Sequence, residues 1–458
     1  MKKSLIIFIL FLSSTAGQSQ VLGYTDLAVL FSERNLKGTA RFNAMGGAFG
    51  ALGGDLSAME VNPAAAGVFK ASELGFSVSY NTNDISSSYY GNTNMNYNYK
   101  TDFEQAGMVS VTNIGGYGDD FAKLVFGFNY TKTANYNNYW LADGNSGIAT
   151  WVDDPTDPNI QYTEAEYQFF DSYTEGGKHQ YSFFLGGQMG KQLYLGAGLK
   201  TQSLDFYQST TQEEYNNDGN NDYVDGYIEQ WQDLNGAGVS LNFGVIMKVN
   251  QALRLGVAYE TPTWWNMTEE SNLFSEDEYD MPGYYEVYYS TDPDYLYHND
   301  YGKVQFYDYK LNTPGQLTAS GALVVKKAGL ISFDYRLVTY NQLQYPYRGF
   351  NNENIYLRQN LQNTSNFSVG TEWRFGPMSL RGGYRYEMSP YKDALEDENT
   401  EEISMGIGFS SKHFKFDLAY QFYTRYSNYS FYPDYPEVDP AVLQQDFSKF
   451  TTSFLVRL

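Results

Sequence analysis

Side chains that commonly carry out catalysis or bind transition metals are scarce in this sequence. The chain of 458 residues contains no Cys and only three His, which are His179, His298 and His413. No two histidines have the spacing of metal ligands, and no Gly-x-Ser-x-Gly motif of a serine hydrolase occurs. A Cys-ligated zinc or iron–sulfur site is excluded. We therefore expect no catalytic residues and no cofactor, and a function other than that of an enzyme.

One acidic stretch has the spacing of a calcium-binding loop. Asp218, Asn220, Asp222 and Glu229 occupy positions 1, 3, 5 and 12 of such a loop, although Tyr223 stands where a glycine normally forms the sharp turn. The spacing predicts either a structural calcium ion in an external loop or an acidic loop that is only solvated.

The overall composition narrows the class of protein. The chain has 53 acidic and 30 basic residues, for a net charge of −23, so binding to the phosphates of nucleic acid is disfavoured. Aromatic residues make up 18% of the chain. After the N-terminus no run of about 18 apolar residues could form a membrane-spanning helix. A secreted all-β protein or a membrane β-barrel is left, since barrel strands alternate in polarity and contain no long apolar runs.

The N-terminus has the features of an export signal. Lys2 and Lys3 precede an apolar run from Leu5 to Leu12, and small residues follow at Ser13 to Ser19. This order predicts a signal peptide at residues 1–19, cleaved after Ala16 or Ser19. The alternative is a short buried helix.

Strict alternation of apolar and polar residues dominates the rest of the chain. In the clearest hairpin, alternate residues from Val239 to Val249 and again from Leu253 to Tyr259 are apolar. The same test predicts 14 strands, near residues 72–82, 103–113, 120–132, 178–190, 192–208, 236–249, 252–262, 303–326, 329–341, 364–376, 377–388, 401–411, 413–425 and 446–458.

The predicted connections alternate in length. Those after even-numbered strands are short, whereas those after odd-numbered strands run from about twelve to about forty-five residues, as in outer-membrane barrels. Two of the long loops, Thr133–Gly177 and Ser209–Asn235, contain eight and seven acids and no Lys or Arg. We predict an all-β fold, a 14-stranded antiparallel transmembrane β-barrel. A β-sandwich or propeller is the alternative, but its loop lengths would be less regular.

The polar strand faces carry charges of both signs. If Gly376 and Pro377 form a two-residue turn, Glu372 lies directly across from Arg381. Arg385 lies on the same face. We expect these three charges to line the lumen, because the lipid-facing surface disfavours them.

Residues 20–70 do not alternate and are rich in glycine. They include Gly46, Gly47, Gly50, Gly53, Gly54 and Asp55, followed by Asn62, Pro63 and Ala64. A barrel of 14 strands is too wide for its own side chains to fill. We therefore predict that residues 20–70 form a plug, or hatch, inside a barrel of residues 71–458. Glycine suits this role, since it allows close approach of backbones and turns at positive φ.

The segment from Gly38 to Tyr80 resembles the plug and first strand of the FadL-type outer-membrane transporters, most specifically in the Asn62-Pro63-Ala64 step. Leu380–Tyr391 and Asp417–Tyr423 are similar as well. The resemblance implies a plugged barrel in the outer membrane of a Gram-negative bacterium. It implies passive uptake of hydrophobic small molecules, such as long-chain fatty acids.

The resemblance also implies a route for the ligand. Capture at an external groove would be followed by an apolar pocket near the mature N-terminus and an exit at a kinked third strand. Leu27, Leu30 and Phe31 are the candidate ligand contacts at the N-terminus. Their spacing equally suits a helix face packed on the wall. Gly127 is the candidate for the kink; the alternative is a small residue facing a crowded plug.

The predicted loop after the seventh strand supplies candidates for external capture, Trp264, Trp265 and Phe274. The alternative for the tryptophans is an aromatic girdle at the membrane interface. The expected partners are a hydrophobic ligand and membrane lipid, with the chain acting as a monomer. The acidic loops would repel a fatty-acid anion, so either divalent cations screen them or the ligand is uncharged. A structural or adhesive barrel with decorated surface loops is the alternative function.

Overall fold

A computed structural model of the chain describes residues 21–458, except 115–120, 153–158, 221, 273–285, 293–294, 300–303, 327 and 434. The predicted signal peptide and Phe274 lie outside the described residues. None of the helices in the described part is long and apolar enough to cross a membrane.

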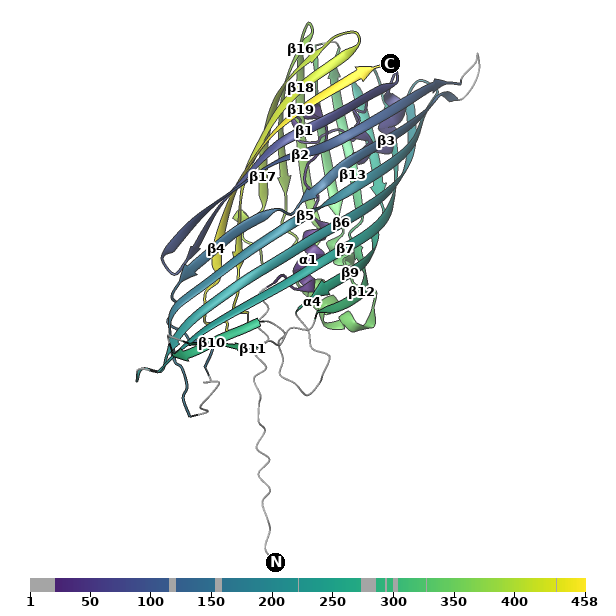
Figure 1. The fold of residues 1–458 in the computed structure, drawn as a ribbon. Coiled ribbons are helices and arrows are strands. Elements are labelled where there is room, and N and C mark those ends of the chain that lie inside the picture. The colour runs from purple at the N-terminus through teal and green to yellow at the C-terminus, as the bar shows by residue number, and fades with distance from the viewer. Residues whose placement is uncertain are drawn as a thin grey trace, which may run out of the picture.

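The strands form one antiparallel sheet that closes on itself, because β1 pairs with β19 from Glu73–Arg457 to Ser88–Val442 (Figure 1). The barrel has fourteen strands, which confirms the predicted fold class. Interruptions divide three of them into β3 and β4, β8 and β9, and β12 and β13, while β10 and β11 form a hairpin beside β7. The bounds are β1 Glu73–Tyr89, β2 Asn92–Asn113, β3 Phe121–Asn135, β4 Asn138–Gly144, β5 Glu164–Met189, β6 Leu193–Asn217, β7 Tyr223–Lys248, β8 Leu253–Glu260, β9 Thr263–Ser271, β10 Glu286–Asp292, β11 Tyr295–Asn299, β12 Gln305–Thr313, β13 Gln316–Val325, β14 Gly329–Val338, β15 Thr364–Phe375, β16 Met378–Glu387, β17 Thr400–Ser410, β18 Phe414–Tyr429 and β19 Ala441–Arg457.

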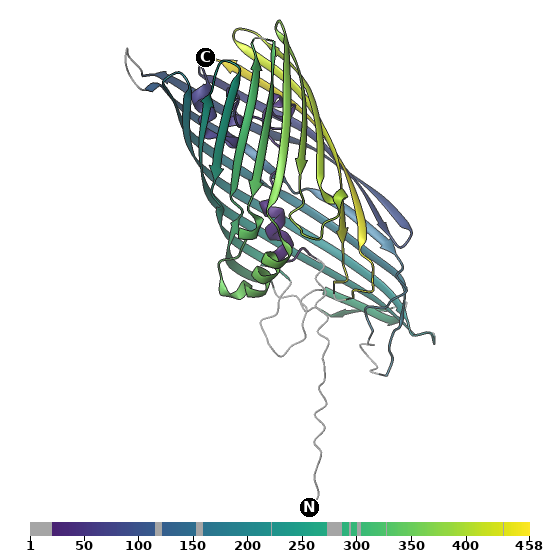
Figure 2. The same cartoon turned by 180° about the vertical axis from the view of Figure 1, so that it is seen from behind.

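The two ends of the barrel differ in their connections. At the upper end in Figure 1, here called the short-turn end, tight turns such as Gly376–Pro377 join the strands. At the other end, the long-loop end, the connections include η2 (Tyr340–Gln342), η3 (Arg348–Phe350), α4 (Asn351–Asn360) and η4 (Glu396–Glu398). Figure 2 shows α4, in green, at this end beside the purple helix α1, which it contacts.

Several strands are much longer than predicted. The segment Ser209–Asn235 is not a loop, because it belongs to β6 and β7, which pair continuously from Leu193–Met247 to Asn217–Tyr223. Residues 90–91 likewise form a tight turn rather than a long loop after the first strand, and β3, β4 and β5 occupy much of Thr133–Gly177. Hydrophobic alternation is weak in these stretches because much of the inward face is polar as well: Gln208, Thr210 and Gln212 of β6 point inward and are buried.

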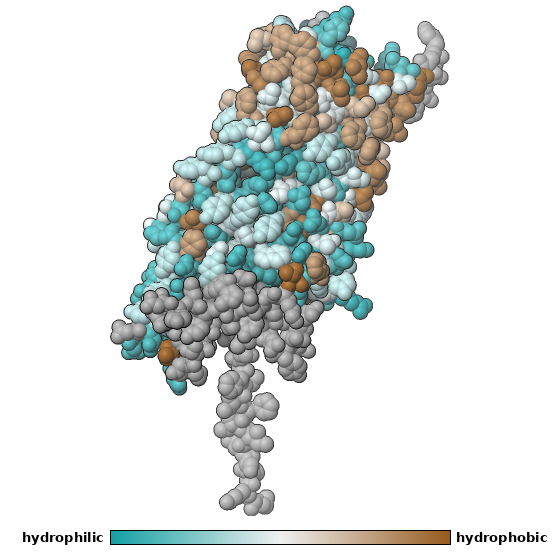
Figure 3. Space-filling model, in the orientation of Figure 1, coloured by the Kyte–Doolittle hydropathy of each residue, from teal (hydrophilic) through white to brown (hydrophobic). Residues whose placement is uncertain are grey.

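Apolar side chains cover only part of the outer surface. On β7, Val239, Leu241 and Phe243 are exposed on the outer face, whereas Ser240 and Asn242 are buried inside. On the face drawn in Figure 3, apolar residues gather in the upper, short-turn part, and the surface toward the long-loop end is mainly hydrophilic. This apolar band marks the membrane-spanning part of an outer-membrane barrel, and the rest of the wall continues beyond it.

Residues 21–70, here called the internal segment, lie inside the barrel. They form α1 (Tyr24–Ser32), α2 (Ala40–Asn43), α3 (Ala58–Val61) and η1 (Pro63–Val68), and most of their side chains are buried. Apolar residues between Leu36 and Phe69 share one core cluster with residues of the wall, among them Val125, Phe184 and Ile246. This part of the barrel interior is therefore packed rather than an open channel.

Candidate functional site

The glycine-rich part of the internal segment turns sharply and lies against the wall. Gly46, Gly47, Gly53 and Gly54 have φ values of 59°, 72°, 65° and 69°, a region that disfavours other residues. The backbone amide of Gly50 donates to Asp334 Oδ2 on β14 at 2.9 Å. These glycines therefore shape the segment and allow its backbone to bind polar groups of the lumen.

Two polar residues organise the segment internally. Asp55 Oδ1 accepts hydrogen bonds from Thr39 Oγ1 at 2.8 Å and from the Ser57 amide at 3.0 Å. Asn62 Oδ1 accepts from the Ala64 amide at 3.0 Å and so caps η1, which begins at Pro63. Both side chains thus hold turns that connect the short helices.

The Asn62-Pro63-Ala64 step is wedged against β6 and β7. Asn62 Nδ2 donates to Gly50 O at 2.8 Å and to Val245 O of β7 at 3.2 Å. A Cβ atom at Gly196 of β6 would lie 2.3 Å from the carbonyl carbon of Pro63. Glycine at position 196 therefore lets the two backbones approach.

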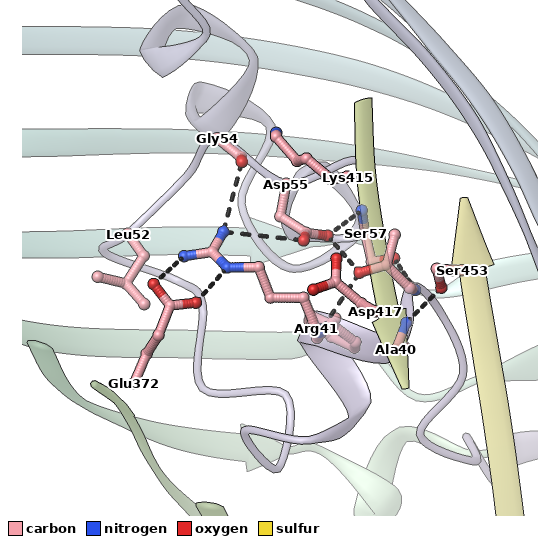
Figure 4. A network of polar contacts seen from close by, with 12 residues as sticks. Ala40, Arg41, Leu52, Gly54, Asp55, Ser57, Glu372, Lys415, Asp417 and Ser453 are labelled. Atoms are coloured by element: carbon pink, nitrogen blue, oxygen red, sulfur yellow. Dashed lines mark hydrogen bonds and ion pairs between the residues drawn. The ribbon is translucent and has the colours of Figure 1, made fainter. Parts of the chain in front are cut away.

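Buried charges fasten the internal segment to the opposite side of the lumen (Figure 4). Glu372 and Arg381 face each other across the β15–β16 turn, as predicted. Glu372 Oε2 accepts from Arg41 Nε at 2.6 Å (Figure 4). It also accepts from Arg381 Nε at 2.9 Å, and Arg381 contacts Asp417 Oδ1 at 2.6 Å. Arg41 belongs to the internal segment, so one carboxylate joins the segment to the wall.

Arg385, the third predicted lumen charge, points inward near the same segment. Its guanidinium donates to the carbonyl of Arg34 at 3.1 Å and contacts the carboxylates of Glu387 and Glu402, the latter at 3.7 Å. Two carboxylates thus lie close to the charge of Arg385.

The helix α1 has two different faces. Leu27 and Phe31 are buried in a cluster of aromatic and aliphatic residues from the wall and the loops, including Phe206, Trp265 and Tyr345. The opposite face, with Asp26, Leu30 and Glu33, borders a cavity. Burial raises the pKa of the Asp26 carboxyl, against a lowering by the hydrogen bond from Tyr391.

This cavity has a volume of about 1340 Å³ and lies between α1, the wall and the loop at residues 388–395. Its lining is mixed, with apolar side chains such as Val29 and Leu30 and many polar ones. Tyr97 and Tyr99 of β2 also line it, although they point outward and are both 58% exposed. The cavity therefore reaches the wall at this place.

The wall is incomplete where the cavity reaches it. The backbone pairing of β2 with β3 ends at Gln105–Thr131, whereas β2 continues to pair with β1 as far as Asn92. The third barrel strand is itself broken at Tyr136 and Asn137, between β3 and β4. A gap in the main-chain ladder thus opens between β2 and β4.

Side chains bridge this gap, here called the seam. Asn98 accepts from the Tyr139 amide at 3.0 Å and donates to the Tyr139 carbonyl at 3.1 Å, and Asn96 accepts from the Leu141 amide at 3.3 Å. Asn92 and Asn94 both donate to the carboxylate of Asp143. The alternate asparagines of β2 thus replace the missing backbone partner of β4.

Comparison with solved structures identifies the architecture. A FadL homologue from Pseudomonas aeruginosa superposes with a TM-score of 0.62 at 13% identity, over 93% of this chain and 99% of that chain. The toluene transporters TodX of P. putida and TbuX of Ralstonia pickettii give 0.54 and 0.53 at 14% and 15% identity, with the same coverage. The chain has the FadL-type fold. No protein-family model matches the sequence, and no curated protein is similar to it in sequence.

The irregular third strand implied by the FadL-type resemblance is present, but not at Gly127. Gly127 pairs without interruption with Val109 and Phe184, and a Cβ atom there would lie 2.7 Å from Met59 Sδ. The alternative, a small residue facing the packed interior, describes Gly127. The break lies nine residues later, at Tyr136. A glycine in a strand can serve close packing instead of a kink, as Gly127 does here.

The paired tryptophans of this FadL-type barrel lie in a strand rather than a loop, because β9 continues the seventh strand past Pro262. They therefore point to opposite faces. Trp264 is 45% exposed on the outside, as in an aromatic girdle, and Trp265 is 2% exposed and packs in the α1 cluster.

The predicted calcium ligands do not converge. Asp218 Oδ1 accepts from the amides of Asn220 and Asp222 within the β6–β7 turn, whereas Glu229 lies along β7, paired with Thr211. Nowhere in the described residues do three or more His, Asp or Glu side chains form a group that could hold a metal ion. The acidic pattern arises from a hairpin tip and an outward strand face.

Proposed function

We propose that the protein takes up hydrophobic small molecules passively across the outer membrane, as a single chain without a cofactor or catalysis. One observation carries the proposal. The cavity beside α1 reaches the wall at the seam, where side-chain hydrogen bonds stand in place of the backbone ladder. A molecule that enters from the long-loop end would therefore need only these side chains to separate in order to leave the barrel, while the packed interior stays in place.

The chemistry of the cavity supports an amphiphilic or small apolar ligand. Each CH₂ group transferred from water to an apolar environment gains about 0.8 kcal/mol. Val29 and Leu30 offer such contact, and the aromatic cluster around α1 adjoins them. The FadL resemblance favours long-chain fatty acids, whereas TodX and TbuX are toluene transporters. Both classes are candidates for this chain.

An uptake experiment tests the proposal. Cells of a Gram-negative host that lacks its own channel for hydrophobic compounds, expressing this protein, should take up labelled toluene or dodecanoate faster than cells with an empty vector. Asn137→Trp should fill the break beside the seam and lower uptake toward the vector level. Asn220→Trp, on the exposed β6–β7 turn, is the matched control and should keep the wild-type rate.

Each outcome has a definite meaning. Uptake by the wild type that equals the vector for both compounds would reject fatty acids and toluene as the transported molecules. Uptake that rises with the wild type and is unchanged in Asn137→Trp would retain transport and reject the route through the seam.

A further inference from the structure

The part of the cavity nearest the seam is lined by carboxamides. Asn81, Asn83, Asn98, Asn135, Asn137 and Asn138 all line it. They come from β1, β2 and the broken third strand, so the topology gathers them at one place. A carboxamide both donates and accepts hydrogen bonds and carries no charge.

Some of these groups have hydrogen-bonding capacity to spare. Asn83 Nδ2 donates to Asn138 Oδ1 at 3.2 Å, and the ammonium of Lys100 donates to Asn137 Oδ1. Within the described residues, Nδ2 of Asn137 and Nδ2 of Asn138 have no protein acceptor. Two amide donors therefore remain available toward the cavity.

The cations that border the cavity are mostly neutralised by protein carboxylates. The pairs are Arg34–Glu260 at 2.7 Å, Arg425–Glu33 at 3.3 Å, Arg336–Glu387 at 3.6 Å, Arg385–Glu402 at 3.7 Å, Lys37–Asp102 at 3.7 Å and Lys449–Glu104 at 3.0 Å. A carboxylate ligand would have to displace one of these partners, which is costly when the remaining charge is buried.

The acidic residues that line the cavity also disfavour an anionic ligand. Asp26, Asp393 and Glu398 border the cavity and have no basic partner within 4 Å among the described residues. They oppose the entry of an anion. In the part of the chain that the structure describes, Lys100 is the one lining cation with no carboxylate that close, and its ammonium is already bound to the amide oxygen of Asn137.

We infer that the seam binds the uncharged, hydroxylated head of an amphiphile, such as an alcohol, a glycerol ester or a sugar, while its apolar part occupies the cavity beside α1. The inference rests on the proposed function and names its substrate class. It distinguishes the ligand from both a fatty-acid anion and a plain hydrocarbon. Discrimination arises because hydroxyl groups satisfy the free amide donors, which a hydrocarbon leaves unpaired.

Binding measurements with chain-matched compounds test this inference. The mature chain in amphipol is titrated calorimetrically with 1-dodecanoylglycerol, dodecanoate, dodecyltrimethylammonium and dodecylbenzene, with empty amphipol as the blank. We expect 1-dodecanoylglycerol to bind at least about tenfold more tightly than the other three, the effect of one to two neutral hydrogen bonds.

Variants locate the head group. The double variant Asn137→Leu/Asn138→Leu should weaken the binding of 1-dodecanoylglycerol roughly tenfold and leave the binding of dodecylbenzene unchanged. Asn220→Leu, on the exposed turn, should change neither. Dodecanoate binding as tightly as the glycerol ester, with that affinity lost in Lys100→Met, would overturn the inference and retain the transport function. Binding of none of the four compounds would reject both.

Discussion

The carboxylate of Glu372 is expected to be the strongest single attachment of the internal segment to the wall. Its side chain is 1% exposed and accepts from the guanidinium groups of Arg41 and Arg381 at 2.6 and 2.9 Å. Glu372→Gln keeps the shape and removes the charge. Loss of one partner of a buried pair typically costs 3–5 kcal/mol. Arg381 keeps Asp417 at 2.6 Å, so we expect about 3 kcal/mol, on the order of a 100-fold change in the unfolding equilibrium.

Guanidinium-induced unfolding of the refolded barrel in micelles measures this cost. Arg374→Gln is the matched control, because Arg374 contacts the same carboxylate at 2.6 Å but is 47% exposed. Its loss should cost at most about 1 kcal/mol. A double-mutant cycle of Glu372→Gln with Arg41→Met should give a coupling energy of about 1–3 kcal/mol. A coupling below about 0.5 kcal/mol, or equal costs for Glu372→Gln and Arg374→Gln, would refute the reasoning.

Three further predictions concern the same unfolding assay. Burial lowers the pKa of Lys37 to about 8, against the opposing effect of two nearby carboxylates. The unfolded chain keeps this proton up to about pH 10.4, so the free energy of unfolding should rise between these pH values by at most roughly 3 kcal/mol, and Lys37→Met should lose that rise. Gly196→Ala should lower the free energy of unfolding by about 1–3 kcal/mol through overpacking. Gly321→Ala should leave it unchanged, because an added Cβ meets nothing within 4 Å there. Equal effects of the two substitutions would contradict the close approach of the Gly196 and Pro63 backbones. Trp265→Ala should lower the free energy of unfolding by about 3–5 kcal/mol, and Trp264→Ala should lower it by less than half as much. The reverse order would show that the inner and outer faces of β9 are misassigned.

The sequence was sufficient to predict the membrane-spanning part of the fold, because the lipid imposes strict alternation there. The pairing register of adjacent strands could also be predicted where a tight turn fixes it, as for Glu372 and Arg381 across Gly376–Pro377. The segment Ser209–Asn235 was wrongly predicted as a loop. Beyond the lipid both faces of a strand can be polar, so hydrophobic periodicity no longer distinguishes strand from loop.

The candidate site was less accessible from the sequence. The seam depends on which strand edges stay unpaired, a property of three-dimensional pairing that no residue spacing encodes. A signal was nevertheless present in the alternate asparagines Asn92, Asn94, Asn96 and Asn98, which share one strand face. Calcium-loop spacing at Asp218–Glu229 misled because the same intervals occur along a hairpin, where alternate acids diverge rather than converge.

Closure of the barrel by β1 and β19 constrains how the chain assembles. The hydroxyls of Ser77 and Ser453 meet at 2.7 Å although they are 376 residues apart, and Ser453 Oγ also accepts the Ala40 amide at 2.6 Å. Contacts between such distant residues form late and slow folding. The C-terminal strand therefore completes both the wall and the seat of the internal segment in one late event. A chain that ends before Ala441 would leave the edge of β1 open, and such an edge is a template for aggregation.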